Sequence, residues 1–583
     1  MKALLVFPPS WHPIMPHLAL PSLTAYLRAS GVQVAQRDLN VEVYDEILSR
    51  RHLGIIMRQL QRGPRRAGGE IPEALREQFA WALAEGPAIA AKVDTAKEVL
   101  RSPRFYEAEA GLDAFLTANQ ALDLASLPYH PSSLSYTGFE SGYPVDASAA
   151  LLMAAKDREY NPFYDILQRI AVPQIVRARP DLVGISLTSA QQVVAGLTLA
   201  HLLREAGLKA HITVGGKMVT CWRDLLPRVP QLFALFDSAI VYAGERPLLR
   251  LIEALDARES LSTVPNLMYR VAGAVQVNEV APALPVAELP PPDFDGLPLD
   301  KYLAPERVLP VSASRGCYWH RCAFCNVGHG ESRHYEEKPA ERVRAEMLQA
   351  VERWGSKHLF FCDEAVSPRI FKQLSRLLIE DGATLNWTAA ARFERSLDAA
   401  TLQQMRQAGC RMLMYGLESG AARMLARMNK GTSLDVARRV LRDGAAAGIW
   451  NHTFAFFGFP GETLEDAQET VDFLFGARRD LHSVCTGTFL LERHSDVEAR
   501  PGDYGVTRLL RQRDRDLTYY YDYQVASGLT AEQAEQIEGY FVDSLPQKQR
   551  AHIYYHDIYR FLYASQFESG APLPLLLPEA GAS

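Results

Sequence analysis

Long apolar runs are missing from this chain of 583 residues. A helix that crosses a bilayer needs about 20 consecutive apolar residues, and no stretch of the sequence provides them. The apolar run at residues 3–7 is too short for a signal peptide and is followed directly by Pro8 and Pro9. We therefore expect no membrane partner, and we interpret the N-terminal run as a first β-strand.

Basic residues are not in excess either. The sequence holds 62 Lys and Arg against 68 Asp and Glu, which gives a formal net charge of −6. This balance offers no positive field to a nucleic-acid backbone or to anionic lipid, so we expect no nucleic-acid partner. Cysteine is scarce, and seven cysteines in a long chain are not typical of a disulfide framework. A reducing compartment, the cytoplasm, is the expected location.

Internal repeats and low-complexity tracts are also absent, which leaves ordinary globular domains as the expected organisation. A chain of this length typically forms about three or four such domains. One proline-rich stretch marks a boundary, because six prolines fall within residues 282–298. We predict one domain over residues 1–280, a linker over 281–300, a second domain over 301–500 and a third over 501–583.

Three of the seven cysteines, Cys317, Cys322 and Cys325, lie within nine residues. Thiolates are soft anionic ligands, so a loop that gathers three of them can bind zinc or three irons of a four-iron cubane. A structural zinc site is closed by four protein ligands, whereas a cubane held by three cysteines leaves one iron open to a small molecule. The zinc alternative needs a further ligand, for which the sequence offers His320, His329 or His334.

The first 280 residues alternate between strand and helix patterns. The run at 3–7 precedes a helical pattern over 18–29 and a second strand at 32–35. The pattern resumes later in the chain with predicted strands at 180–189, 211–214 and 239–245. Parallel strands of this kind form a doubly wound sheet, which binds ligands in a crevice at its carboxyl edge.

Residues 45–175 interrupt this alternation with helix-rich sequence. We predict helices over 73–85, ended by Gly86-Pro87, and over 107–124. No catalytic motif is found in this insertion. Two interpretations stay open, a cover over one face of a bound cofactor and a lobe that serves packing alone.

Six strand-and-helix units follow the proline-rich linker. Their predicted strands are 308–312, 358–361, 385–391, 412–416, 453–457 and 484–490. Six units of this kind fit a partial (β/α)6 barrel, whose chemistry takes place at the carboxyl ends of the strands. Beyond residue 501 we predict a helical region with a tyrosine cluster that helps to shape a substrate pocket.

The cysteine loop directly after the first barrel strand resembles the cluster loop of radical S-adenosylmethionine (SAM) enzymes. That superfamily usually spaces its cysteines x3 and then x2, whereas this chain has x4 and then x2. The resemblance implies that Cys317, Cys322 and Cys325 hold a 4Fe-4S cluster and that SAM chelates its open iron. It also implies SAM contacts at positions that end barrel strands or flank the loop: Phe324, Glu364 (with Asp363 as the second choice), Arg392, Glu418, Ser419 and Gly458.

A doubly wound sheet ahead of such a barrel resembles the cobalamin-dependent (B12-binding) radical SAM family, in particular its class B methyltransferases. The implied fold is α/β, with a Rossmann-like cobalamin-binding domain, a partial (β/α)6 radical SAM barrel and a helical C-terminal region. The resemblance implies cobalamin contacts at strand ends: Ser186, Thr188, Ser189, Gly215, Gly216, Gly244 and Glu245.

The Asp-x-His-x-x-Gly motif, whose histidine ligates cobalt in other cobalamin proteins, is absent after the first strand. His17 lies near the corresponding place without the aspartate and glycine, and a helix cap is the competing interpretation. We expect cobalamin to bind without a histidine ligand.

The resemblance implies methylation of an unactivated carbon of a small-molecule or peptide substrate, with an external electron donor such as flavodoxin or ferredoxin. Rearrangement, cyclisation or oxidation on the same cofactors is the alternative within the family. A methylthiotransferase would need further amino-terminal cysteines, and residues 1–220 contain none. A zinc- and cobalamin-binding regulatory protein without turnover is the alternative from another class.

Overall fold

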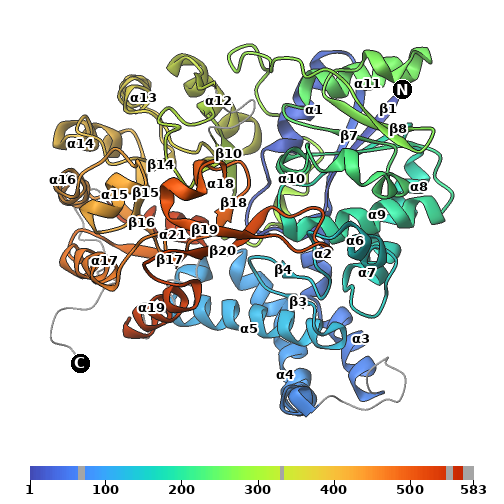
Figure 1. The fold of residues 1–583 in the computed structure, drawn as a ribbon, viewed down its shortest axis with the longest axis horizontal. Coiled ribbons are helices and arrows are strands. Elements are labelled where there is room, and N and C mark those ends of the chain that lie inside the picture. The colour runs from blue at the N-terminus through green and yellow to red at the C-terminus, as the bar shows by residue number, and fades with distance from the viewer. Residues whose placement is uncertain (63–72, 328–333, 546–555, 569–583) are drawn as a thin grey trace. The chain divides into compact units, whose positions relative to one another are not determined.

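The computed structural model describes residues 1–62, 73–327, 334–545 and 556–568. It divides the chain into two compact units, which are described separately (Figure 1). Unit 1 comprises Met1–Leu284, Leu289–Arg307 and Gln512–Thr518. Unit 2 comprises Pro285–Glu288, Val308–Arg511 and Tyr519–Ser583. In the described part of the chain, no helix has both the length and the apolar character needed to cross a membrane.

Unit 1 is built on a seven-stranded sheet with the order β2-β1-β5-β6-β7-β8-β9. The first five strands of this order are parallel, and β8 and β9 are antiparallel additions at one edge. The chain passes from β1 to β2 on one side and continues with β5 on the other, which creates a topological switch point between β1 and β5. The strands are β1 (Lys2–Phe7), β2 (Gln33–Asp38), β5 (Leu182–Ser186), β6 (His211–Gly215), β7 (Ser238–Ile240), β8 (Leu267–Val271) and β9 (Ala274–Val277).

Helices cover the sheet of unit 1 because its strands are apolar on both faces. Helices α1 and α11 pack on one face, where Leu20 and Leu251 join Leu5 and Phe7 in a single buried cluster. The helices of the unit are α1 (Ala19–Ala29), α2 (Leu39–Ile47), α3 (Arg50–Gln61), α4 (Arg76–Leu100), α5 (Ala108–Ser126), α6 (Ser148–Ala154), α7 (Phe163–Ile170), α8 (Val172–Ala178), α9 (Val193–Glu205), α10 (Lys217–Cys221) and α11 (Glu245–Ala257).

The predicted insertion contains α3, α4 and α5, a short hairpin of β3 (Ser133–Leu134) and β4 (Phe139–Glu140), and the helices that lead back to the sheet. The predicted helix stop at Gly86-Pro87 is wrong, because α4 continues through both residues to Leu100. A Cβ on Gly86 would lie 2.4 Å from Met57 Sδ, so this glycine permits close packing of α4 on α3. Tertiary packing therefore overrides the local helix-breaking signal.

Unit 2 contains an open sheet of six parallel strands in the order β10-β13-β14-β15-β16-β17. The helices α12, α13, α14, α16 and α17 form an arc outside these strands (Figure 1). This arrangement confirms the predicted six-unit fold with a parallel sheet. The strands are β10 (Val308–Val311), β13 (His358–Phe361), β14 (Asn386–Ala391), β15 (Cys410–Glu418), β16 (Trp450–Phe457) and β17 (Ser483–Thr488). The helices are α12 (Ala340–Trp354), α13 (Pro368–Glu380), α14 (Ala399–Gln407), α15 (Ala422–Arg427), α16 (Leu434–Ala446), α17 (Leu464–Gly476) and α18 (Asp496–Ala499).

The prediction of a purely helical region after residue 501 is wrong in its first part. There β19 (Val506–Leu510) and β20 (Tyr520–Val525) form a three-stranded antiparallel sheet with the earlier strand β18 (Leu491–Glu492), in the order β18-β20-β19. The aromatic and β-branched residues of β20 suit a strand better than a helix. Helices α19 (Ala531–Ser544) and α21 (Asp557–Ala564) follow, whereas the predictions for residues 546–555 and 569–583 lie outside the described residues.

Candidate functional site

The three-cysteine loop leaves the carboxyl end of β10, and a carboxylate fixes its base. Both oxygens of Asp363, just beyond β13, accept from the Ala313 N–H at 3.1 and 2.9 Å. The Ser314 hydroxyl lies 2.5 Å from the same carboxylate. Strands β11 (Ser314–Arg315) and β12 (Glu336–Glu337) then pair antiparallel and close the loop from both sides. The loop therefore begins and ends beside the carboxyl ends of β10 and β13.

The Asp363 carboxylate thus forms hydrogen bonds with the base of the loop, and burial raises the pKa of this carboxyl to about 6. Glu364, the first choice for a SAM contact, is exposed and carries no such bonds in the described structure. Its charge contributes to raising the pKa of Cys325, so the carboxylate lies near that thiol. The ranking of Glu364 before Asp363 stays a prediction, and the geometry favours it.

The second half of the loop is held by backbone hydrogen bonds. Ala323 is fully buried, its N–H donates to Met428 O at 2.9 Å and its carbonyl accepts from Val497 N–H at 3.1 Å. Asn326 donates to the Tyr519 hydroxyl at 2.7 Å. These bonds fix the chain on both sides of Cys322 and Cys325.

The thiols stand in a partly buried environment. Burial raises the pKa of the Cys325 thiol to about 12 and also raises the pKa of Cys322. The charge of Cys317 contributes to raising the pKa of Cys322, and that of Cys322 contributes to raising the pKa of Cys325. Thiolates are the form that binds iron, so loading of this site releases protons.

No three His, Cys, Asp or Glu side chains are grouped to hold one metal ion within residues 1–62, 73–327, 334–545 and 556–568. A zinc ion draws all of its ligands to one point, whereas each cysteine of a cubane binds a different iron. His329, one candidate for a zinc ligand, lies outside the described residues.

Arg392, at the end of β14, reaches the cysteine loop directly. Its Nη1 lies 4.0 Å from Cys322 Sγ, its Nη2 donates to Lys430 O, and its Nε donates to Glu394 Oε1 at 3.4 Å. The side chain is only 4% exposed, so a buried guanidinium stands beside the Cys322 thiol. A cation held there suits the predicted contact with SAM, which carries a carboxylate.

Glu418 and Lys430 form a buried ion pair near the same loop. Lys430 Nζ donates to Glu418 Oε1 at 2.6 Å and lies 5.9 Å from the centroid of the Phe324 ring. Phe324 in turn packs edge-on against Phe456, with ring centroids 5.2 Å apart. The structure therefore brings together two predicted residues, Phe324 and Glu418, through a lysine that the sequence reasoning did not assign a role.

Ser419 and Gly458 are placed differently. The Ser419 hydroxyl is fully buried, lies 3.0 Å from Thr470 Oγ1 and accepts from Ala421 N–H, so its predicted ribose contact would require these bonds to break. Gly458 has a φ of +89°, and a Cβ there would lie 2.6 Å from Ala534 Cβ. Its carbonyl accepts from the Tyr523 hydroxyl at 3.1 Å, which fixes the loop after β16.

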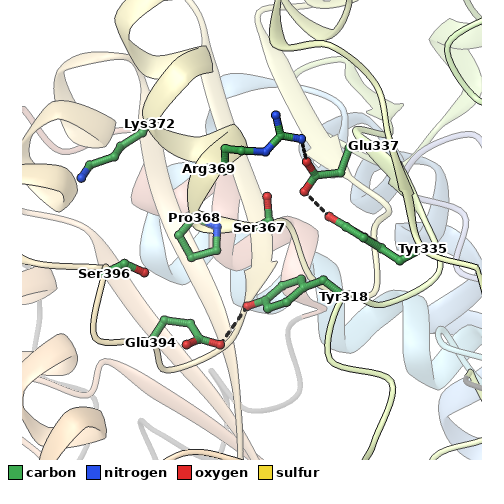
Figure 2. Close-up of a pocket in the computed structure, with 9 residues that line it drawn as sticks. All are labelled: Tyr318, Tyr335, Glu337, Ser367, Pro368, Arg369, Lys372, Glu394 and Ser396. Atoms are coloured by element: carbon green, nitrogen blue, oxygen red, sulfur yellow. Dashed lines mark hydrogen bonds and ion pairs between the residues drawn. The ribbon is translucent and has the colours of Figure 1, made fainter.

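Figure 2 shows a pocket of about 770 Å³ on the outer side of the cysteine loop. Tyr318, which follows Cys317, points across it and donates to Glu394 Oε1 at 3.3 Å. Next to Tyr318, the Tyr335 hydroxyl lies 2.5 Å from Glu337, which also pairs with Arg369. The pocket lining thus ties the loop to the segments after β13 and β14.

In unit 1, the predicted cobalamin residues gather at the carboxyl edge of the parallel sheet. Their segments directly follow three neighbouring strands of the sheet order β5-β6-β7. Partly exposed positions along this edge are Thr188, Ser189, Gly215, Gly216, Gly244 and Glu245, whereas Ser186 is buried. Small and hydroxyl residues beside a switch point fit a large ligand with many polar groups.

Gln192 organises this edge, although the sequence reasoning did not find it. The side chain is fully buried, and its Oε1 accepts from the Thr188 and Ser189 N–H groups at 2.9 and 3.2 Å. Its Nε2 donates to Pro8 O at 2.7 Å. One side chain therefore joins the loops after β1 and β5 across the switch point.

His17 occupies the loop between β1 and α1 as a helix cap. Its Nδ1 accepts from the Ala19 N–H at 3.2 Å, and its ring stacks on Phe7 with centroids 4.9 Å apart. Burial lowers the pKa of His17 to about 4, so the ring is neutral. A neutral imidazole that accepts through Nδ1 carries its proton on Nε2, which leaves no lone pair there for a metal.

In comparison with known families, residues 311–474 match the Radical SAM superfamily. The whole chain has the fold of cobalamin-dependent radical SAM enzymes, which confirms the predicted fold class. It is similar to the structure of the cobalamin-dependent SAM radical enzyme OxsB with aqua-cobalamin bound, with a TM-score of 0.59 and 15% identity over 97% of this chain and 72% of that one.

Two further proteins are similar to this chain, one in structure and one in sequence. The radical SAM methyltransferase TsrM from Kitasatospora setae, solved with cobalamin and a [4Fe-4S] cluster, has a TM-score of 0.56 and 14% identity over 93% of this chain and 92% of that one. The uncharacterized methyltransferase PH0819 of Pyrococcus horikoshii is 27% identical over 300 residues, or 50% of this chain. The match spans 64% of that protein, less than two thirds of its length.

Proposed function

We propose that this protein is a cobalamin-dependent radical SAM enzyme that methylates an unactivated carbon of its substrate. The observation that carries the proposal is the three-cysteine loop at the carboxyl end of β10, inside a chain that has the fold of OxsB and TsrM. When bound, the cluster and SAM supply a 5′-deoxyadenosyl radical that abstracts hydrogen, and methylcobalamin supplies the methyl group.

The residues of unit 2 have three tasks in this reaction. Cys317, Cys322 and Cys325 hold the cluster, and the bonds from Asp363 and Ala323 keep their loop in place. The Arg392 guanidinium orients the SAM carboxylate, and Glu364 accepts from the SAM amino group. Phe324 provides an apolar face for the adenine, which lies beside Gly458, while Glu418 accepts from a ribose hydroxyl.

The carboxyl edge of the sheet in unit 1 is the proposed site for cobalamin. Its glycines let the ligand approach the backbone, and Thr188 and Ser189 offer hydroxyls to its polar side chains. Because His17 donates no lone pair in its capping state, cobalt is bound without a histidine ligand. The electron for SAM cleavage comes from an external donor, and the substrate is a small molecule or a peptide.

The test is anaerobic reconstitution with iron, sulfide and cobalamin, followed by turnover with SAM that carries an isotope-labelled methyl group. We expect 5′-deoxyadenosine and a product that contains the label. 5′-Deoxyadenosine without label in the product would favour the second candidate, a rearrangement, cyclisation or oxidation on the same cofactors. That candidate has support because OxsB is described as a radical enzyme and not as a methyltransferase. A protein that retains zinc and cleaves no SAM would refute both.

A further inference from the structure

The four-residue segment between Cys317 and Cys322 contains a side chain that leaves the loop and docks elsewhere in unit 2. Trp319 donates from its indole Nε1–H to Asn429 O at 2.8 Å. The next residue, His320, has a φ of +40°, a left-handed conformation that is uncommon outside glycine. The chain turns at His320, and the indole of Trp319 reaches the segment between α15 and α16.

The Trp319 indole docks in a notch that exists because residue 431 is glycine. A Cβ on Gly431 would lie 2.0 Å from Trp319 Cζ2 and 2.2 Å from its Cη2. Real Cβ atoms do not approach other atoms so closely, so the indole occupies the volume that a side chain at position 431 would need. Gly431 also has a φ of +72°, which independently favours glycine there.

The docked indole stands next to the buried guanidinium at the site. Arg392 Cζ lies 4.6 Å from the centroid of the Trp319 ring, within cation–π distance, and Arg321 Cζ lies 5.3 Å from it. Arg392 Nη2 donates to the carbonyl of Lys430, which lies between the Asn429 and Gly431 anchors of the indole. Trp319 and Arg392 therefore rest on the same three-residue segment, and each limits the movement of the other.

We propose that Trp319 is a positioning residue that locks the cysteine loop onto residues 429–431 and thereby holds Arg392 in the orientation that binds SAM. The proposal rests on the proposed function for its ligand. The cysteines alone bind the cluster, whereas Trp319 sets how tightly SAM binds next to it. The additional residue of the x4 spacing thus supplies the turn that lets the indole reach its notch.

The first experiment measures SAM binding by titration into the reduced, cluster-loaded protein, followed through the SAM-induced change of the cluster's electron paramagnetic resonance spectrum. We expect Trp319→Leu to keep its iron and sulfide content and to weaken SAM binding about tenfold, the loss expected for a desolvated cation–π contact. Trp319→Phe keeps a ring face in the notch and is expected to stay within about threefold of the wild type.

The matched control is Trp354→Leu. Arg353 Cζ lies 4.8 Å from the Trp354 ring at the end of α12, so this variant removes a similar stacked indole outside the cysteine loop. Its SAM affinity should equal that of the wild type. Gly431→Ala should weaken SAM binding as Trp319→Leu does, because it expels the indole. In the double variant the two effects should not add, since both break one contact.

Unchanged SAM affinity in a cluster-loaded Trp319→Leu protein would overturn the proposal. Loss of the cluster from Trp319→Leu with retention in Trp354→Leu would also overturn it, because Trp319 would then serve cluster assembly and not SAM binding.

A second measurement does not depend on the proposed function. In protein without iron, trypsin cleavage after the exposed Arg321 reports how firmly the loop is docked. We expect cleavage there about tenfold faster in Trp319→Leu than in Trp354→Leu or the wild type. If the wild type bound neither cluster nor SAM, the proposed function would fail, and equal cleavage rates in all three proteins would show separately that the lock does not exist.

Discussion

Glu462 accepts a hydrogen bond from the Gly458 N–H through one carboxylate oxygen, while its other oxygen, Oε1, is buried and meets the hydrogen-bond criteria with no group in the described part of the chain. The side chain is fully buried in the loop that follows β16, and burial raises the pKa of its carboxyl from 4.5 to about 7. The same loop contains the glycine proposed to face the adenine. The protonation of one carboxyl group is therefore linked to the shape of one wall of the site.

This linkage predicts a pH dependence of stability. Between pH 4.5 and 7 the folded state holds a proton on Glu462 that the unfolded chain has released, so the stability that it contributes is complete below pH 4.5 and lost as the pH rises through 7. The loss amounts to about 3 kcal/mol at most. Glu462→Gln mimics the protonated acid and should remove this slope, which denaturant unfolding at pH 5 and pH 8 would measure.

The control for Glu462→Gln is Glu469→Gln, a change of the same chemistry on the exposed face of α17. It should leave the difference in unfolding free energy between pH 5 and pH 8 as it is in the wild type. Equal slopes in the wild type and Glu462→Gln would show that Glu462 is already ionised in the folded protein at pH 5.

The cysteine variants make the second prediction. Replacement of Cys317, Cys322 or Cys325 by alanine removes one of three cluster ligands, so each variant should lose most of its reconstituted iron and all 5′-deoxyadenosine formation. Cys485→Ala, a thiol on β17 outside the loop, is the control and should keep both. Chemical iron and sulfide analysis, with chromatography of the nucleoside product, gives the answer. Full iron content in any one of the three loop variants would show that the replaced cysteine is not a cluster ligand.

The third prediction concerns the axial ligand of cobalt. Because Nδ1 of His17 accepts from the Ala19 N–H, the spectrum of bound cob(II)alamin should lack superhyperfine splitting from a protein nitrogen. His17→Asn provides another side-chain acceptor for the helix start and should bind cobalamin within about threefold of the wild type. Nitrogen splitting in the wild type that disappears in His17→Asn would instead identify the histidine as the ligand.

The fourth prediction concerns Gln192, whose amide satisfies three backbone groups on two loops. Gln192→Ala leaves these groups without their partner and should cost about 2–4 kcal/mol of unfolding free energy. Cobalamin affinity should fall with it, because the loop of Thr188 and Ser189 loses its attachment to Pro8. Gln191→Ala, the exposed neighbour in the chain, is the matched control and should change neither quantity. Denaturant unfolding and cobalamin titration measure the two effects, and loss of stability without loss of affinity would limit Gln192 to a structural role.

Much of the fold was predictable because local patterns determine it. The strand expected at residues 358–361 is observed with the same bounds, His358–Phe361, since a short apolar run between helical patterns has few alternatives in an α/β chain. The local signal failed at Gly86-Pro87, where packing on Met57 sustains the helix. At Tyr520–Val525 the aromatic and β-branched residues favoured the strand that is observed, and the prediction of a helical region did not use them.

The candidate site was predictable in part for the same reason. Three cysteines close in sequence must be close in space, whereas the Gln192 bond to Pro8 joins residues 184 positions apart and leaves no sequence signal. Asp363 and Glu364 are adjacent acids whose different environments are visible only in the structure. The Asp363 carboxylate accepts from the Ala313 N–H, whereas Glu364 is exposed. The role of Lys430 depends likewise on its contact with Glu418 across a strand and a helix.

The notch at Gly431 has a consequence for the history of this sequence. A chain with one residue fewer between its first two cysteines would not direct an indole to this place, and the positive φ of residue 431 would then be the remaining reason for glycine there. Tryptophan at 319 and glycine at 431 should therefore be gained and lost together among descendants of a common ancestor. A lineage that kept the longer spacing and the tryptophan while carrying valine or leucine at 431 would have to place the indole side chain elsewhere.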